Sequence, residues 1–102
     1  NQRNISVLSI AAYPTEPGPW GDANTLPLGR LVFGSIFGVV FSDDNGETIT
    51  MGGLFDEFQT FRIHQITVMA RPEGGLRIVA MGAVNGGGCG CSRVWTSDDH
   101  GV

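Results

Sequence analysis

One short motif occurs twice in this chain, and each copy ends a similar run of segments. The motif is Ser-x-Asp-x-Gly, and its residues are, in chain order, Ser42, Asp44, Gly46, Ser97, Asp99 and Gly101. Ahead of each copy lies an apolar segment that ends in Pro, residues 5–14 in the first half and 63–72 in the second, at an offset of 63 − 5 = 58. An apolar segment that begins with Gly29 or Gly75 follows, and a third one leads into the motif. The chain is therefore one unit repeated twice, and such repeats are typical of stacked architectures.

The segments of each unit have the composition and the periodicity of β-strands. With 16 Gly and 5 Pro among 102 residues, and with many Val and Ile, the chain favours strands joined by tight turns. Residues 76–83 have a pattern of period two. This pattern places on one face of a strand Leu76, Ile78, Ala80 and Gly82.

We predict an all-β fold made of two antiparallel units of four strands each, residues 1–52 and 53–102. In the first unit, a fourth strand is expected after the motif, near residues 48–51. Residues 53–60, which link the two units, are the only candidate for a helical turn.

The chemistry of the motif favours a structural role in a tight turn. A carboxylate such as that of Asp44 accepts hydrogen bonds from backbone N–H groups two or three residues further on, and a Ser hydroxyl can do the same. The Gly two residues after the Asp supplies a backbone with positive φ. Thr48 adds a β-branched residue where the next strand begins. Because the second copy has the same Ser, Asp and Gly, at Ser97, Asp99 and Gly101, we predict two similar turns.

With these residues the chain resembles the Asp-box, or bacterial neuraminidase repeat, whose pattern is Ser-x-Asp-x-Gly-x-Thr-Trp. The first copy, at 42–49, follows the pattern as far as the Thr and has Ile49 in place of the aromatic residue. The second copy, at 97–102, matches at the Ser, Asp and Gly, and the chain then ends before the Thr-Trp. In that family the motif forms the hairpin between the third and fourth strands of a β-propeller blade. The resemblance covers nearly the whole chain and implies two blade-like units.

The resemblance also implies that the motif is not the ligand site. Asp-boxes lie on the outer rim of the propeller, away from the central pocket, so Asp44 and Asp99 are expected to fasten turns. A calcium site that uses the flanking Asp43 or Asp98 is the alternative, and the lack of a third nearby carboxylate in the sequence argues against it. Two blades cannot close a ring. The resemblance therefore implies either an incomplete propeller, which the end of the chain inside the second motif favours, or a ring closed by several copies.

Two residues are candidates for binding a substrate. Arg62 lies in the stretch Phe-Arg-Ile-His, which resembles the Phe/Tyr-Arg-Ile-Pro motif of sialidases. The Arg of that motif holds the substrate carboxylate, as a planar guanidinium does with two hydrogen bonds. His64 replaces the Pro, and the other sialidase catalytic residues cannot be placed in this chain, so a surface ion pair is the alternative role of Arg62. Trp20 lies in the Pro-rich loop 15–28, where an exposed indole is suited to stacking on a sugar, whereas Trp95 is expected to pack.

Charge and cysteine content argue against several other classes of protein. The formal net charge is −4 and the 6 basic residues are all scattered Arg, which argues against nucleic acid and against a membrane surface. No apolar run reaches the ~20 residues of a membrane span, and no signal-peptide leader opens the chain. Cys89 and Cys91 are expected to be small residues of the Gly-rich loop 85–91, and a metal site with His64 or His100 is the alternative, without zinc-type spacing. We therefore expect no metal and no cofactor.

The expected function is that of an extracellular Asp-box propeller of the glycan-acting class, whose partners are a glycan and further blades or copies. If it is an enzyme, it is a sialidase-like glycoside hydrolase with an incomplete catalytic set here. The adjacent Asp56 and Glu57 face opposite ways on a strand and are poor candidates for flanking one glycosidic bond. A propeller scaffold for protein binding is one alternative. A virion coat protein is another, because residues 53–72 resemble a strand region of jelly-roll capsids, but that resemblance leaves the repeat unexplained.

Overall fold

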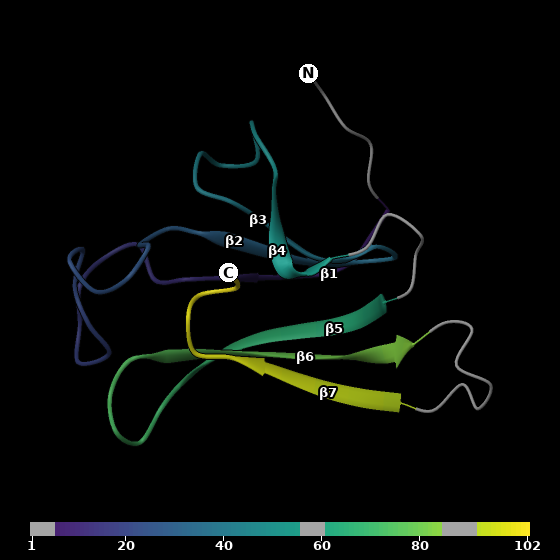
Figure 1. Ribbon diagram of the computed structural model, residues 1–102. Coiled ribbons are helices and arrows are strands. Elements are labelled where there is room, and N and C mark those ends of the chain that lie inside the picture. The colour runs from purple at the N-terminus through teal and green to yellow at the C-terminus, as the bar shows by residue number, and fades with distance from the viewer. Residues whose placement is uncertain (1–5, 56–60, 85–91) are drawn as a thin grey trace.

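The computed structural model describes residues 6–55, 61–84 and 92–102, and in these residues it contains strands, turns and loops but no helix (Figure 1). The strands are, in chain order, β1 (Val7–Ala12), β2 (Leu31–Ser35), β3 (Gly38–Ser42), β4 (Thr50–Phe55), β5 (Phe61–Ala70), β6 (Leu76–Val84) and β7 (Ser92–Ser97). They form two antiparallel sheets with the orders β1-β2-β3-β4 and β5-β6-β7, so each strand pairs with its neighbour in sequence. The all-β prediction is confirmed.

The predicted segments carry strands, but two details differ from the prediction. The second sheet has three strands among the described residues, not the predicted four. β4 begins at Thr50 and continues to Phe55, so residues 53–55 are extended and do not form a helical turn. In this stretch Phe55 pairs with Gly38 of β3, and the N–H of Gly53 donates to the carbonyl oxygen of Gly101 at 2.8 Å. This strand of the first sheet therefore extends past residue 52.

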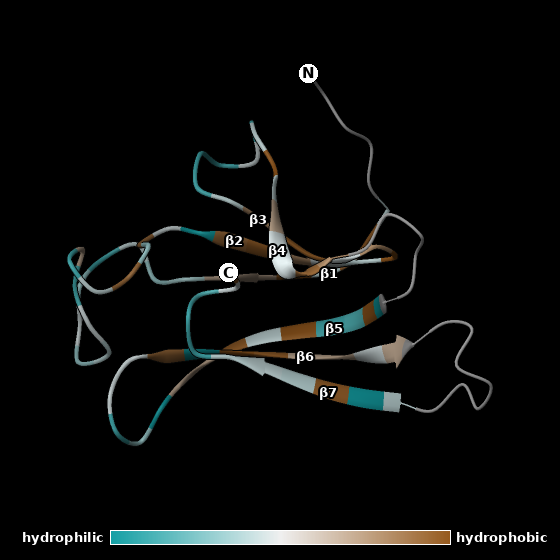
Figure 2. Ribbon diagram, in the orientation of Figure 1, coloured by the Kyte–Doolittle hydropathy of each residue, from teal (hydrophilic) through white to brown (hydrophobic). Residues whose placement is uncertain are grey.

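Alternation along the strands places apolar side chains on the side of each sheet that is covered. On β6 the residues of the predicted face are buried and their neighbours are at least partly exposed, and the buried ones are Leu76, Ile78, Ala80 and Gly82. Along β2 and β3 hydrophobic residues dominate, whereas several of the connecting loops are hydrophilic (Figure 2).

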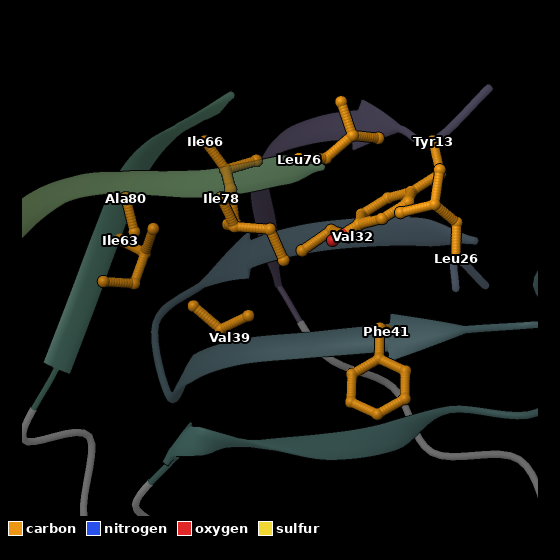
Figure 3. Packing of buried hydrophobic residues seen from close by; sticks show 10 residues of the cluster. All are labelled: Tyr13, Leu26, Val32, Val39, Phe41, Ile63, Ile66, Leu76, Ile78 and Ala80. Atoms are coloured by element: carbon orange, nitrogen blue, oxygen red, sulfur yellow. The ribbon is translucent and has the colours of Figure 1, made fainter. Parts of the chain in front are cut away.

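The two sheets lie face to face, with the hydrophobic core between them (Figures 1 and 3). β5 contacts β1, β2 and β3 of the first sheet. The buried core residues come from both sheets and from the long β1–β2 loop, and they are Tyr13, Leu26, Val32, Val39, Phe41, Ile63, Ile66, Leu76, Ile78 and Ala80. Gly34 permits the close approach of the sheets, because a Cβ atom there would lie 2.6 Å from Cγ2 of Ile63.

The strand registers show that the second sheet repeats the first. In the first sheet Leu31 pairs with Ser42 of the first motif, and in the second Ile78 pairs with Ser97 of the second motif. Strands β2 and β3 therefore correspond to β6 and β7, at offsets of 78 − 31 = 47 and 97 − 42 = 55.

Strands β1 and β5 correspond as well, although at a different offset from the predicted one. Ile10 pairs with Phe33, and Ile66 pairs with Ala80, the counterpart of Phe33. The structural offset is thus 66 − 10 = 56 and not 58. The prediction aligned Pro14 with Pro72 and was wrong by two residues. The reason is that the β5–β6 ladder has two more residue pairs at its turn end than the β1–β2 ladder. Both strands also have a register shift at the same place, after Val7 in β1 and after Ile63 in β5.

This correspondence reveals that the sheets pack head to tail. Val39 is 5% exposed between the sheets, whereas its counterpart Val94 is 63% exposed on the far face of the second sheet. Conversely, Ile66 is 4% exposed between the sheets and its counterpart Ile10 is 58% exposed. At these two positions, the face that one sheet turns to the other is the face that its counterpart leaves exposed, whereas Val40, the counterpart of Trp95, is 1% exposed.

The two ends of the sheets carry different connections. One end, which we call the motif end, carries the long loop 13–30, the motif turns 43–49 and 98–102, and the β5–β6 turn 71–75. The long loop, the β5–β6 turn and the C-terminal segment lie on the left of Figure 1. β5 begins and β6 ends at the other end of the second sheet.

Candidate functional site

The first motif closes the β3–β4 hairpin through a compact set of hydrogen bonds. Ser42 Oγ donates to Asp44 Oδ1 at 2.8 Å and accepts from the N–H of Gly46 at 2.8 Å. Asp44 accepts from Thr48 twice, from the N–H at 2.8 Å and from the hydroxyl at 2.6 Å. The bonds from Thr48, with that from Ser42, lower the pKa of Asp44 from 3.8 to about 2. The N–H donors Gly46 and Thr48 lie four residues after their acceptors, whereas the N–H of Asp44 donates to Ser42 Oγ at 3.4 Å across the predicted separation of two residues.

The second motif has the same turn. Ser97 Oγ donates to Asp99 Oδ1 at 2.6 Å and accepts from the N–H of Gly101 at 3.0 Å. The two residues at the tip have φ angles of 62° and 92° in the first turn and 65° and 91° in the second. Gly supplies the later position in each turn, and the earlier one is taken by Asn45 or His100, residue types that adopt positive φ more readily than most. Both Asp44 and Asp99 therefore form hydrogen bonds within their own turns.

In each motif the residue directly after the Ser is a further Asp, which is Asp43 in the first motif and Asp98 in the second. An Arg of the same unit binds this Asp. Arg30 donates from Nε and Nη2 to the two oxygens of Asp43 at 2.7 and 2.8 Å. Arg77 does the same to Asp98 at 2.7 and 3.1 Å. Hydrogen bonds from these Arg side chains lower the pKa of both carboxyl groups. Because the guanidinium occupies the oxygens that calcium would need, the geometry favours ion pairs over the calcium alternative.

Arg30 also joins the two units. Its Nη1 donates to the carbonyl oxygen of His100 at 2.8 Å, and its guanidinium carbon lies 4.0 Å from the centroid of the Phe41 ring. The hydroxyl of Tyr13 is hydrogen-bonded to Nδ1 of His100 at 2.9 Å. Burial raises the pKa of Tyr13 from 10.0 to about 12. We call Tyr13, Arg30 and His100 the clasp, because together they hold the second motif turn against the first unit.

A hollow of about 320 Å³ opens beside the clasp, between the long loop and the second motif turn. The residues that line it include Trp20, Arg71, Asp98 and His100. Arg71 forms an ion pair with Glu73 at 2.5 Å and lies 3.7 Å from Asp98. The hollow thus presents one aromatic surface beside several hydrogen-bonding groups, which is the composition of many small-molecule sites.

Trp20 is partly buried in the structure and is not the fully exposed platform that the sequence suggested. The indole packs against the hydrophobic core, and its six-membered ring lies so close to Gly18 that a Cβ atom there would be 2.5 Å away. Its Nε1 is buried without a hydrogen-bond partner among the described residues. The ring is therefore held rigidly in the wall of the hollow.

A larger hollow of about 650 Å³ lies between β4 and β7. Most of its lining is apolar, with Leu54, Ile78 and Trp95 on its walls and Asp99 of the second motif turn at its margin. Trp95 packs against the core, as expected. This hollow is the opening between the outermost strands of two stacked sheets, and its polar side chains come from a single segment, residues 96–99.

The two predicted substrate-binding residues lie at different ends of the molecule. Arg62 is exposed near the start of β5, where it pairs with Ala83. The hollow of Trp20 includes Leu76, which pairs with Ala70 at the end of β5. At ~3.3 Å per residue, these positions are separated by roughly 25 Å along the strand. The structure therefore does not bring Arg62 and Trp20 into one site.

Several candidates lie outside the described residues, namely Asp56, Glu57, Cys89 and Cys91. His64 is exposed on β5. Within residues 6–55, 61–84 and 92–102, no group of three or more metal-binding side chains occurs. No helix in the described part of the chain is long and apolar enough to cross a membrane.

The residues that the sequence did not reveal as a group are those of the clasp and the paired arginines. A signal for the arginines is present, because Arg30 and Arg77 each follow closely on the Gly that opens a unit's second strand, and each motif has an Asp directly after its Ser. The contact of Tyr13 with His100 joins positions 87 residues apart and has no comparable signal in one sequence.

Comparison of the chain with protein-family models, with curated proteins and with solved structures finds no significant match.

Proposed function

We propose that this chain is a pair of successive blades of an extracellular Asp-box β-propeller that binds a glycan. The observation that carries the glycan part is the hollow at the motif end, in which the rigid indole of Trp20 lies among Arg71, Asp98 and His100. The propeller part is supported by the head-to-tail packing of two sheets whose motif turns are built alike.

Strand order supports a propeller over the virion alternative. Each described sheet is a plain meander in which consecutive strands are neighbours. A jelly roll contains Greek keys, which place non-consecutive strands side by side. A propeller blade is a four-stranded meander that packs on the next blade, and the first sheet has this form.

The chemistry of the hollow suits a sugar. An aromatic ring offers an apolar face to the C–H groups of a sugar, and the charged and imidazole groups around it have donors and acceptors for hydroxyl groups. The volume of about 320 Å³ lies at the lower end of the ~300–1,000 Å³ range of small-molecule sites. We therefore propose a monosaccharide or disaccharide unit of a glycan as the ligand.

The carboxylates near the hollow favour binding over hydrolysis. A glycosidase needs one carboxylic acid whose pKa is raised so that it can donate a proton. The pKa of Asp98 is lowered by its hydrogen bond with Arg77. The pKa of Glu73 is lowered too, by its own backbone N–H and by Arg71. Both side chains are thus held in the ionised form, which can accept hydrogen bonds from a sugar but cannot protonate a leaving group.

A second candidate is a carboxylate clamp of the sialidase type at Arg62. The exposed position of this side chain near the start of β5 is compatible with such a role. A propeller scaffold that binds proteins is the third candidate, and it predicts that neither place binds a sugar.

A glycan array followed by calorimetry tests these candidates. We expect the purified chain to bind a defined glycan, Trp20→Leu to weaken that binding by at least ~10-fold, or about 1.4 kcal/mol, and Arg71→Gln to weaken it as well. Arg62→Ala is the matched control, because it removes an exposed side chain at the other end of the sheets. Circular dichroism establishes that each variant is folded.

The outcomes separate the candidates. Loss of binding in Arg62→Ala with full binding in Trp20→Leu and Arg71→Gln would favour the carboxylate clamp. Absence of binding to any glycan would contradict the proposal and favour the protein scaffold. A fluorogenic sialoside assay is expected to show no turnover, and turnover would contradict the preference for binding.

A further inference from the structure

The first sheet has an apolar row on the face that points away from the second sheet. Ile10, Phe33, Val40 and Met51 pair directly with one another across all four strands. The row's two ends are exposed, since Ile10 is 58% and Met51 46% exposed, whereas Val40 in its middle is 1% exposed. We call these four residues the first outer face. An apolar row that crosses a whole sheet is typical of a face that another layer covers.

The second sheet has a comparable face on its far side. Val79 pairs with Thr96, and Met81 pairs with Val94. Met81 is 46% and Val94 63% exposed. We call these four residues the second outer face.

The two outer faces correspond to the two surfaces that already pack together inside the chain. Through the strand registers, the first outer face matches Ile66, Ala80 and Trp95, which line the core side of the second sheet. The second outer face matches, on the core side of the first sheet, Val32, Gly34, Val39 and Phe41. The first outer face therefore corresponds to one side of the interface between the two sheets, and the second outer face corresponds to the other side.

We propose that a second copy of this chain packs on the first outer face with its own second outer face, so that copies associate head to tail and repeat the interface between the two sheets. An interface of this heterologous kind joins copies into a ring or a filament. The proposal depends on the packing of the sheets and goes beyond glycan binding.

The interface inside the chain and the one proposed between copies differ in side-chain size at one point. Inside the chain, the smallest residue, Gly34, lies against Ile63. Val7 is the counterpart of Ile63, because Val7 pairs with Ser35 and Ile63 pairs with Gly82, the counterpart of Ser35. Met81 is the counterpart of Gly34, so the corresponding pair between copies is Met81 against Val7. Val7 is 48% exposed in the single chain, whereas Ile63 is 0% exposed. Val7 keeps a backbone carbonyl and γ methyl groups like those that a Cβ atom at Gly34 would meet on Ile63. Met81 therefore keeps the sheets of two copies further apart at this point than the two sheets of one chain.

Arg30 of the clasp gives a separate reason to expect that copies associate head to tail. Arg30 is only 12% exposed and uses Nη1 to reach the carbonyl of His100 in the second unit. Its counterpart Arg77 is 35% exposed, and its Nη1 has no hydrogen bond to any described residue. The counterpart of His100 is Asn45, which is exposed and has the same positive φ. We expect Arg77 of one copy to donate from Nη1 to the carbonyl oxygen of Asn45 in the next.

Light scattering of two charge variants, alone and mixed, tests the proposal. Wild-type chain is expected to form assemblies larger than a dimer as its concentration rises. Ile10→Glu removes only the first outer face and Val94→Glu only the second, so each variant alone should be monomeric. A buried unpaired charge is expected to weaken association by roughly 30-fold or more. An equimolar mixture still contains one intact pair of faces, and it should give a dimer and nothing larger.

The mixture distinguishes head-to-tail association from symmetric pairing. If Ile10→Glu alone or Val94→Glu alone forms dimers, the faces pair with themselves and the proposal is wrong. A wild-type chain that stays monomeric at all concentrations also overturns it, and glycan binding by that monomer would leave the function proposed above intact. Asn24→Glu, an exposed change in the long loop, is the matched control and should assemble as wild type. Should Val94→Glu fail to fold by circular dichroism, Met81→Glu removes the same face.

Discussion

Gly34 of the first sheet lies directly against Ile63 of the second, and this contact makes Gly34→Ala a sensitive test of their packing. The added Cβ atom would lie 2.6 Å from Cγ2 and 2.9 Å from the carbonyl oxygen of Ile63. Ordinary contacts between carbon atoms are about 3.5–4.0 Å. Ile63 is 0% exposed and β-branched, so its side chain has little freedom to move away, and its carbonyl belongs to the backbone.

Two opposing effects determine the size of the change. In the interior of a strand, Ala is favoured over Gly by roughly 0.5–1 kcal/mol because Gly loses more backbone entropy on folding. Overpacking a close-fitting core costs about 1–3 kcal/mol. We therefore expect Gly34→Ala to lower the free energy of unfolding by about 1–2 kcal/mol. For a domain of this size, that loss lowers Tm by roughly 5–15 °C.

Urea unfolding followed by Trp fluorescence and thermal unfolding followed by circular dichroism measure this change. Ala12→Gly is the matched control, because Ala12 is exposed on β1 and the exchange reports the Gly–Ala difference without a contact between sheets. If Gly34→Ala is as stable as wild type or more stable, the sheets do not approach each other as described.

Two further stability predictions concern polar groups. Ser42→Ala should lower the free energy of unfolding by about 1–3 kcal/mol, because Ser42 is 1% exposed and its hydroxyl is hydrogen-bonded to both Gly46 and Asp44. The control variant Ser92→Ala, at an exposed position on β7, should change the free energy of unfolding by less than ~0.5 kcal/mol. Burial raises the pKa of Tyr13 from 10.0 to about 12, so its contribution to stability is complete below pH 10 and should disappear as the pH rises toward 12. Thermal unfolding between these pH values should show this loss in wild type and a smaller one in Tyr13→Phe, and equal losses would contradict the burial of Tyr13.

The sequence predicted the strands well because their pattern is local. Period-two alternation on β6, the Pro and Gly residues between segments and the repeated motif are each visible within a few residues. The turn chemistry was predicted for the same reason, since Ser42, Asp44 and Thr48 lie within seven positions of one another. The offset between β1 and β5 was misjudged by two residues, because it depends on how far the β5–β6 ladder extends. The sequence of one strand does not determine how that strand pairs with its neighbour.

The candidate site was harder to predict because it joins distant parts of the chain. Trp20 could be selected as an aromatic residue in a Pro-rich loop, but its partial burial depends on packing against the core. The clasp depends on Arg30 meeting a backbone carbonyl 70 residues away, and any residue type supplies such a carbonyl. The opposite placement of Arg62 and Trp20 follows from strand direction, which becomes visible only once the sheets are assembled.

Methyl NMR spectroscopy of the Val94→Glu chain tests the head-to-tail packing of the two sheets most directly. The γ2 methyl group of Ile63 is predicted to show an NOE to the α protons of Gly34. A soluble paramagnetic agent is predicted to relax the methyl groups of Ile10 strongly and those of its counterpart Ile66 weakly. Protection of Ile10 with exposure of Ile66, or the absence of any NOE between the sheets, would contradict this packing.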